Sequence, residues 1–228
     1  MNIIKSIRNL SRWERGLWLG SLVLILLSFL GVGEVRLLTV LASMVGATAL
    51  IFVAKGDAIG QLLTMVFAAL YAVISFQFCY YGEMITYLGM TLPSAGVAMV
   101  NWLKHPYAER EVKVSRLSRR SLVWLAISSV PVTAVFGILL EQFGTANLFF
   151  STVSITTSYL ASMLTILRSP YYAVAYACND IILIILWILA TREDGSYLPM
   201  VFCFVIFLIN DSYGFWQWQQ MKKKQKER

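Results

Sequence analysis

Charged side chains are scarce in this sequence. Lys, Arg, Asp and Glu make up 14% of the 228 residues, whereas 58% of the residues are hydrophobic. A soluble domain of this length has too little interior to bury so much apolar surface, so the composition excludes a soluble globular protein. The sequence therefore indicates an integral membrane protein.

Patterns typical of catalysis and metal binding are also missing. The single histidine, His105, lies in a polar stretch, and the three cysteines (Cys79, Cys178 and Cys203) lie in apolar segments without a CxxC spacing. The sequence contains neither a phosphate-binding loop nor the spacing of a metal cluster or catalytic triad. We therefore predict a protein that is not an enzyme and that holds no cofactor and no metal.

The apolar residues are grouped in long runs. A helix crosses a bilayer core about 30 Å thick with roughly 20 apolar residues. Eight stretches meet this requirement, at residues 17–33, 37–54, 59–81, 84–103, 121–140, 146–167, 170–190 and 197–219. The first stretch follows basic residues as a signal peptide does, but it lacks a small-residue cleavage pattern, so we count it as a spanning helix. The prediction is an all-α membrane protein with eight transmembrane helices.

The basic residues predict the orientation of these helices. With the amino terminus in the cytoplasm, 17 of the 19 Lys and Arg residues fall on cytoplasmic segments, and only Arg36 and Arg192 fall outside. This asymmetry predicts that both termini are cytoplasmic. The charge lies in short clusters, such as "KHPYAEREVKVSRLSRR" and "MKKKQKER", which is typical of contact with membrane lipid and not with nucleic acid. A regulatory partner is the alternative for the longer cluster.

The directions of the helices predict two similar units. The second, third and fourth helices run inward, outward and inward, and the last three helices repeat this order after one linking helix. Such a 3+1+3 plan is that of transporters with parallel repeats, which hold their substrate between the two halves near the midplane. The predicted parts are 1–36 with an extra amino-terminal helix, 37–103 with the first triple bundle, 104–145 with the basic loop and linking helix, 146–219 with the second bundle, and the basic tail 220–228.

Two Asn-Asp pairs interrupt the last two apolar runs. Asn179 and Asp180 lie about 15 Å into their helix, and Asn210 and Asp211 lie about 20 Å from the outer end of theirs, so both pairs are deep in the bilayer. A charged group costs at least about 2.5 kcal/mol there and marks a functional site by default. Hydrogen bonds between helices are the alternative. No Lys, Arg or His lies in a predicted span to neutralise the carboxylates, so protonation, a bound cation or hydrogen-bond donors must satisfy them.

Aromatic residues near the two pairs extend the candidate site. Trp187 and Trp216 are each placed either to stack a flat cationic ring or to lie at the membrane interface. Tyr213 follows the second pair and is a further candidate. Other polar residues in the predicted spans are Gln61, Gln77, Ser94, Asn101, Ser154, Thr156, Thr157, Ser158 and Tyr159.

Other tryptophans and two prolines have predicted roles outside the site. The tryptophans predicted to lie at the membrane interface are Trp13, Trp18, Trp124 and Trp218. Pro93 and Pro131 interrupt the fourth and fifth helices, where a proline removes a backbone hydrogen bond and kinks the helix. Each is a candidate hinge, with a static bend as the alternative.

Several motifs of residues 37–220 resemble those of the PnuC family of bacterial vitamin transporters. These motifs are "VISFQFCYYGE", "MTLPSAGVAMVNWLKHPY", "CNDIILIILW" and "FLINDSYGFWQWQQMKK". The resemblance implies a nicotinamide riboside carrier of the bacterial plasma membrane, with an architecture related to SWEET sugar transporters. The extra first helix departs from the seven-helix core of that family.

The resemblance also implies a mechanism and partners. Uptake proceeds by facilitated diffusion, and a cytoplasmic ribosylnicotinamide kinase traps the product; the family architecture further suggests a homo-oligomer. Nicotinamide riboside carries a cationic ring, a carboxamide and hydroxyls. The side chains expected to bind it are Asn179, Asn210 and Gln77 by hydrogen bonds, Trp187 or Trp216 by stacking, and Asp180 or Asp211 by charge.

Three alternatives to this substrate and mechanism stay open. The chain is expected to carry thiamine, riboflavin or a deoxynucleoside if it follows other members of the family. A proton- or cation-coupled carrier is expected if Asp180 or Asp211 is a coupling carboxylate. A membrane scaffold or sensor is expected if the basic loop recruits a partner.

Overall fold

The fold was obtained as a computed structural model, which describes residues 3–30, 37–77, 80–108, 111–145 and 147–227. Its regular elements within these ranges are all helices. Their order is α1 (Ile3–Arg8), α2 (Arg12–Phe29), α3 (Leu37–Ala54), α4 (Ala58–Gln77), α5 (Tyr81–Thr86), the π-helix η1 (Tyr87–Thr91), α6 (Leu92–Lys104), α7 (Arg119–Gln142), α8 (Leu148–Ile166), α9 (Tyr172–Glu193), the 3-10 turn η2 (Gly195–Tyr197) and α10 (Leu198–Glu227).

Six of the described helices are long and apolar enough to cross a membrane: α3, α4, α7, α8, α9 and α10. The all-α prediction is therefore confirmed. The helix α2 is as long as α3, but Arg12, Glu14 and Arg15 occupy its first turn. These charged residues make α2 less apolar than the six candidate spans. Parts of three predicted spans, residues 31–33, 78–79 and 146, lie outside the described residues.

The stretch predicted as one span at 84–103 is divided into α5, η1 and α6. The wide turns of η1 end where the backbone N–H of Leu92 bonds to the carbonyl of Tyr87, immediately before Pro93, which has no N–H to donate. π-Helical turns are uncommon and occur often at functional sites. Pro131 lies inside α7, which continues as one helix from Arg119 to Gln142.

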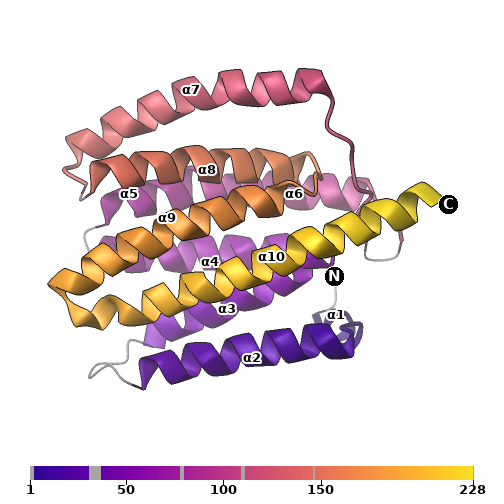
Figure 1. The fold of residues 1–228 in the computed structure, drawn as a ribbon, viewed down its shortest axis with the longest axis horizontal. Helices are drawn as coiled ribbons and strands as arrows, with labels where there is room; N and C mark the ends of the chain where they lie inside the picture. The colour runs from indigo at the N-terminus through magenta and orange to yellow at the C-terminus, as the bar shows by residue number, and fades with distance from the viewer. Residues whose placement is uncertain (1–2, 31–36, 78–79, 109–110, 146, 228) are drawn as a thin grey trace.

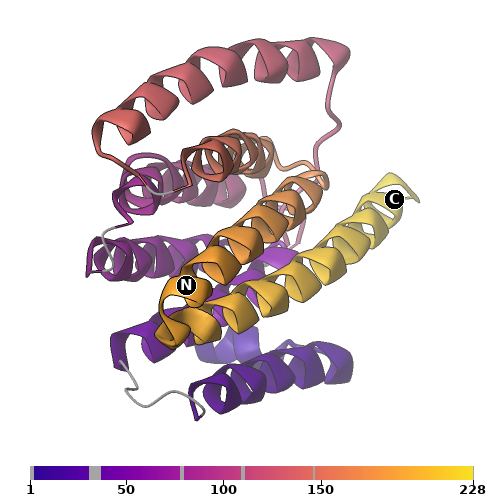
Figure 2. The same ribbon diagram turned by 60° about the vertical axis from the view of Figure 1, so that its left-hand side comes forward.

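Six helical positions form a closed ring. Around it, α3 packs on α4, α4 on α6, α6 on α8, α8 on α9, α9 on α10 and α10 back on α3. The remaining long helices lie outside the ring, where α7 packs on α8 and α2 packs on both α3 and α10. Figures 1 and 2 show α2 and α7 at opposite edges of the molecule. The ring therefore leaves its centre available for a cavity.

Trp218 corrects one prediction. We expected this residue at the membrane interface, but its side chain is fully buried, with an exposed fraction of 0%. Its indole N–H donates to the Val53 carbonyl at 2.9 Å, and its ring packs on Trp102 and Tyr172 at centroid distances of 5.3 and 4.9 Å. Neighbouring helices therefore satisfy both the polar and the apolar parts of this side chain.

The predicted basic tail 220–228 is helical as far as Glu227, because α10 continues without interruption from Leu198. Gln225 holds its end in place. The side chain of Gln225 accepts a hydrogen bond from the Val114 N–H at 2.8 Å and donates to the Val112 carbonyl at 3.0 Å. Part of the basic loop after α6 is thereby bound to the end of α10.

Candidate functional site

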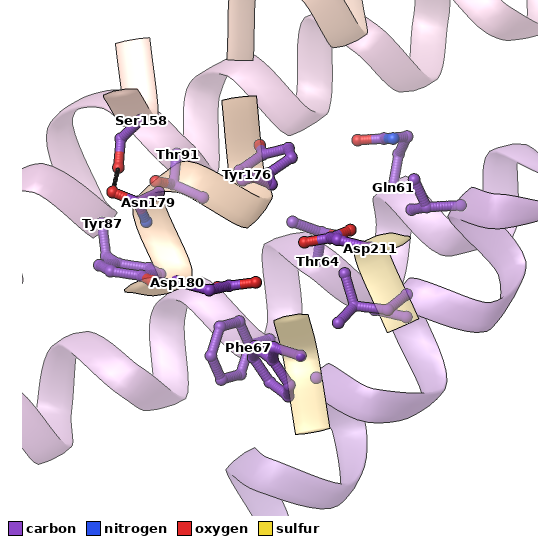
Figure 3. A pocket seen from close by; sticks show the side chains of 15 residues that line it. Gln61, Thr64, Phe67, Tyr87, Thr91, Ser158, Tyr176, Asn179, Asp180 and Asp211 are labelled. Carbon is purple, nitrogen blue, oxygen red and sulfur yellow. Dashed lines mark hydrogen bonds between the residues drawn. The ribbon is translucent and has the colours of Figure 1, made fainter. Parts of the chain in front are cut away.

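A cavity lies at the centre of the six-helix ring. The space between the residues around it that protein atoms leave unoccupied is about 630 Å³, and part of this space is open to solvent. Its lining residues come from α3, α4, η1, α8, α9 and α10, and Figure 3 shows the cavity from close by. The lining residues are Gly46, Ala49, Leu50, Val53, Gln61, Thr64, Phe67, Tyr87, Thr91, Ser158, Tyr176, Asn179, Asp180, Phe207 and Asp211. A concave, mostly apolar site with a few polar groups is the usual form of a small-molecule site.

The Asn-Asp pair of α9 faces this cavity with both side chains. The Oδ1 atom of Asn179 accepts hydrogen bonds from Thr157 Oγ1 at 2.8 Å and from Ser158 Oγ at 3.0 Å. These two hydroxyl groups on α8 fix the orientation of the amide, so its NH₂ group points away from them. Asn179 is therefore a fixed hydrogen-bond donor at the wall of the cavity.

The Asn-Asp pair of α10 is divided between two directions. Asp211 lines the cavity, whereas Asn210 faces α2 and donates to Ser21 Oγ at 3.1 Å and to the Ile206 carbonyl at 2.8 Å. Consecutive residues of an α-helix point about 100° apart, so one of them can face the centre while the other faces a helix outside the ring. The structure therefore brings three of the four paired residues together.

The two carboxyl groups of the cavity face each other from α9 and α10 (Figure 3). Asp180 and Asp211 are buried, with exposed fractions of 4% and 3%. They interact with each other electrostatically, and Asp180 Oδ2 has no hydrogen-bond partner within the described chain. None of the described residues that line the cavity is Lys, Arg or His. A proton or a cationic ligand is therefore what this arrangement can accept most favourably.

Aromatic rings border the carboxyl groups. Tyr87, Tyr176 and Phe67 surround them in Figure 3, and Phe67 meets Tyr87 edge to face at a centroid distance of 5.8 Å. The face of an aromatic ring attracts a cation. The sequence does not distinguish these rings, because tyrosine and phenylalanine are common throughout the apolar runs.

The amide of α4 that lines the cavity is Gln61, whereas we had expected Gln77. Gln61 is buried and lies beside Thr64 on the wall of the cavity, while Gln77 is exposed at the last residue of α4. The two are 16 positions apart, which corresponds to about 24 Å along a helix. Both glutamines are polar residues inside one apolar run. The sequence therefore does not show which of the two lines the cavity.

Trp187 is buried, but it lies outside the set of residues that line the cavity. Its indole N–H donates to Tyr71 Oη at 3.1 Å. Its ring packs on Tyr80 and Tyr197 at centroid distances of 5.1 and 5.7 Å. The structure therefore places this tryptophan in an aromatic layer between the cavity and the η2 end of the ring.

The last two expected site residues point away from the cavity. The Tyr213 hydroxyl donates to Glu14 Oε1 on α2 at 3.2 Å. Trp216 is 55% exposed and packs on the Tyr213 ring at a centroid distance of 5.9 Å. Both residues thus belong to the side of α10 that faces α2 and the exterior.

Comparisons with known proteins agree with a membrane transporter. The profile of the family described as nicotinamide mononucleotide transporter matches residues 36–220. The nicotinamide riboside transporter PnuC of Neisseria mucosa is 30% identical over 234 residues, which cover 96% of this chain and 89% of that protein.

A solved structure supports the same assignment. The crystal structure of the vitamin B3 transporter PnuC superimposes with a TM-score of 0.83 at 28% identity, over 95% of this chain and 94% of that one. The likeness therefore extends over almost the whole fold. The chain belongs to the PnuC family of nicotinamide mononucleotide transporters, and it is an integral membrane transporter and not an enzyme.

Proposed function

We propose that this chain carries nicotinamide riboside through the central cavity. The observation that supports this substrate most strongly is the charge of the cavity, which has Asp180 and Asp211 in its lining and no basic side chain among its described lining residues. The family description names nicotinamide mononucleotide and the Neisseria relative is named for the riboside. The mononucleotide carries a phosphate, which two carboxyl groups would repel, whereas the riboside has only its cationic pyridinium ring.

The lining side chains match the groups of this ligand. Asn179 and Gln61 provide donors and acceptors for the carboxamide and the ribose hydroxyls. Tyr87 provides an aromatic face for the pyridinium ring, and Asp180 and Asp211 offset its charge. The proposed site thus keeps Asn179, Asp180 and Asp211 from the sequence prediction. Tyrosines of the cavity take the place of the two predicted tryptophans.

The architecture we propose is the 3+1+3 plan with one extra helix. In this arrangement α3, α4 and α5–η1–α6 form the first triple bundle (37–103), α8, α9 and α10 form the second (146–219), and α7 links them. The ring order supports this plan, because a twofold rotation that exchanges the bundles carries each packed pair of helices onto another. With α2 counted as a span, the chain crosses the membrane eight times.

We infer that the transporter works by facilitated diffusion in a bacterial plasma membrane with both termini in the cytoplasm. The distribution of 17 basic residues on one side against 2 on the other supports this orientation. A cytoplasmic kinase that phosphorylates the riboside would keep its free concentration low and maintain net uptake. The interrupted helix at η1 and Pro93 is the proposed hinge in the first bundle, and Pro131 is the corresponding candidate in α7.

Two experiments test this proposal. In calorimetry of the purified protein we expect binding of nicotinamide riboside and none of nicotinamide mononucleotide. Tighter binding of the mononucleotide would refute the charge argument. In proteoliposomes we expect uptake of labelled riboside without a pH or sodium gradient.

Two other functions are favoured by the paired carboxyl groups. Thiamine is also a hydroxylated cation, so it is the second candidate substrate, and preferential binding of thiamine in the same calorimetry would replace the riboside. A proton- or cation-coupled carrier would use Asp180 or Asp211 as the coupling group. An absolute dependence of uptake on a gradient would establish that mechanism in place of facilitated diffusion.

A further inference from the structure

The amino-terminal helix α2 is bound to two neighbouring helices of the ring. On α3, Thr48 Oγ1 accepts a hydrogen bond from the Trp18 indole N–H at 3.0 Å. On α10, the Asn210 amide donates to Ser21 Oγ at 3.1 Å. Because α3 belongs to the first proposed bundle and α10 to the second, α2 spans the contact between the bundles, which we call the α3–α10 seam.

Glu14 joins the same two helices at the amino-terminal end of α2. It is buried, with an exposed fraction of 2%. Its Oε2 atom lies 2.9 Å from Lys55 Nζ, immediately after α3, and its Oε1 atom accepts the Tyr213 hydroxyl from α10 at 3.2 Å. Oε2 also accepts the Ser11 N–H at 2.6 Å in a capping box. A buried carboxylate with an ion pair and two further hydrogen-bond partners is costly to displace.

The α3–α10 seam itself is closely packed. A Cβ atom added at Gly214 would lie in ordinary van der Waals contact with Ala54 Cβ, at 3.6 Å, and closer, at 3.1 Å, to the Tyr172 hydroxyl of α9. Near the same end, the Trp218 indole donates across the seam to the Val53 carbonyl. Small residues on both helices thus keep α3 and α10 in close contact, which is usual for tightly packed membrane helices, and the absence of a side chain at Gly214 leaves room for the Tyr172 hydroxyl.

We propose that α2 is a brace that keeps α3 and α10 together throughout the transport cycle. Access to the cavity then changes elsewhere in the ring, and this seam is its fixed side. The inference rests on the proposed transport function. It also gives a role to a segment that precedes the matched family region, residues 36–220, and to Asn210 and Tyr213, which do not line the cavity.

A disulfide across the seam tests whether it stays closed. Cβ atoms 3.6 Å apart fall within the range of about 3.5–4.5 Å found in disulfides. We would introduce Ala54→Cys and Gly214→Cys into a chain whose own three cysteines are replaced by serine. After oxidation, we expect riboside uptake to retain at least about half of the rate of the same reduced protein. Loss of uptake on oxidation and its return on reduction would overturn the proposal.

A second measurement tests the brace without relying on transport. We expect Ser21→Ala combined with Glu14→Ala to slow disulfide formation between the two introduced cysteines by about fivefold, because the hydrogen bonds of α2 with Asn210 and Tyr213 and its ion pair with Lys55 are removed. Glu14→Gln keeps an acceptor for Tyr213 and should restore part of the rate. Ser28→Ala is the matched control, since among the described residues Ser28 Oγ bonds to the Ile25 carbonyl of its own helix and to no other helix.

The outcomes of these experiments separate the two proposals. An unchanged rate of disulfide formation in the double variant would overturn the brace, whether or not the protein transports. Absence of riboside uptake by the cysteine-free parent would refute the transport function, while the rate of disulfide formation would still decide on the brace.

Discussion

Replacement of Asp211 by asparagine should change the charge selectivity of the cavity without changing its shape. The side chain keeps its volume and a hydrogen-bonding oxygen, but it loses its negative charge. Asp180 remains opposite it, so the cavity becomes less negative and not neutral. The affected quantity is therefore the attraction between the cavity and a cationic ligand.

The size of the effect follows from Coulomb's law. A pyridinium charge about 5 Å from a carboxylate is stabilised by about 3 kcal/mol at an effective dielectric constant of about 20. Two neighbouring carboxyl groups disfavour ionisation of both, so Asp211 carries less than a full negative charge on average. We therefore expect Asp211→Asn to cost about 2 kcal/mol of binding free energy, or about 30-fold in the dissociation constant. A ligand without charge should lose less than about threefold.

Calorimetry with a matched pair of ligands measures this difference. Nicotinamide riboside has a cationic ring, and its reduced dihydropyridine form has a neutral ring of nearly the same size. Asn210→Ala is the control variant, because Asn210 lies next to Asp211 on α10 but faces Ser21. We expect this control to bind both ligands within about threefold of the unaltered protein. Equal losses for the two ligands in Asp211→Asn would refute the electrostatic argument.

Two further predictions concern the walls of the cavity. Trp187→Phe removes the hydrogen bond to Tyr71 and should lower stability by about 1–2 kcal/mol while leaving riboside affinity within about threefold. Thermal unfolding measures the stability and calorimetry measures the affinity. Weakened binding with unchanged stability would place the indole in the site. Gly46→Ala would bring a methyl group to 2.5 Å from Phe207 Cζ and should cost about 1–3 kcal/mol of stability and weaken binding. Gly20→Ala, which meets no atom within 4 Å, is its control, and equal thermal unfolding midpoints of the two variants would contradict the packing argument.

The helices, and the places of three polar residues along them, were predictable from the sequence. Long apolar runs leave a chain in a membrane no alternative to helices, because every backbone polar group must be satisfied internally. Counting residues along these helices placed Asn179, Asp180 and Asp211 deep in the bilayer, and all three line the cavity. Depth depends only on the number of residues from the end of a helix, so a single sequence contains it.

The direction of each side chain around its helix was less predictable. Asn210 has the same depth and polarity as Asp211, yet it bonds to Ser21 on a helix 189 positions away. Gln61 and Gln77 were equivalent by composition, but only the former lies on the cavity wall. These outcomes depend on which helices are neighbours, and hydropathy does not encode neighbours.

The sequence alone thus determined that this protein is a helical membrane protein with buried carboxyl groups in two of its helices, because the cost of exposing polar backbone and charge to lipid is local to each segment. Only the tertiary structure decided that Asp180 and Asp211 face each other, that Tyr87 and Gln61 join them, and that Asn210 and Tyr213 hold α2. Those relations arise when six helices close into a ring, and contacts between distant segments set the rotation of each helix within it.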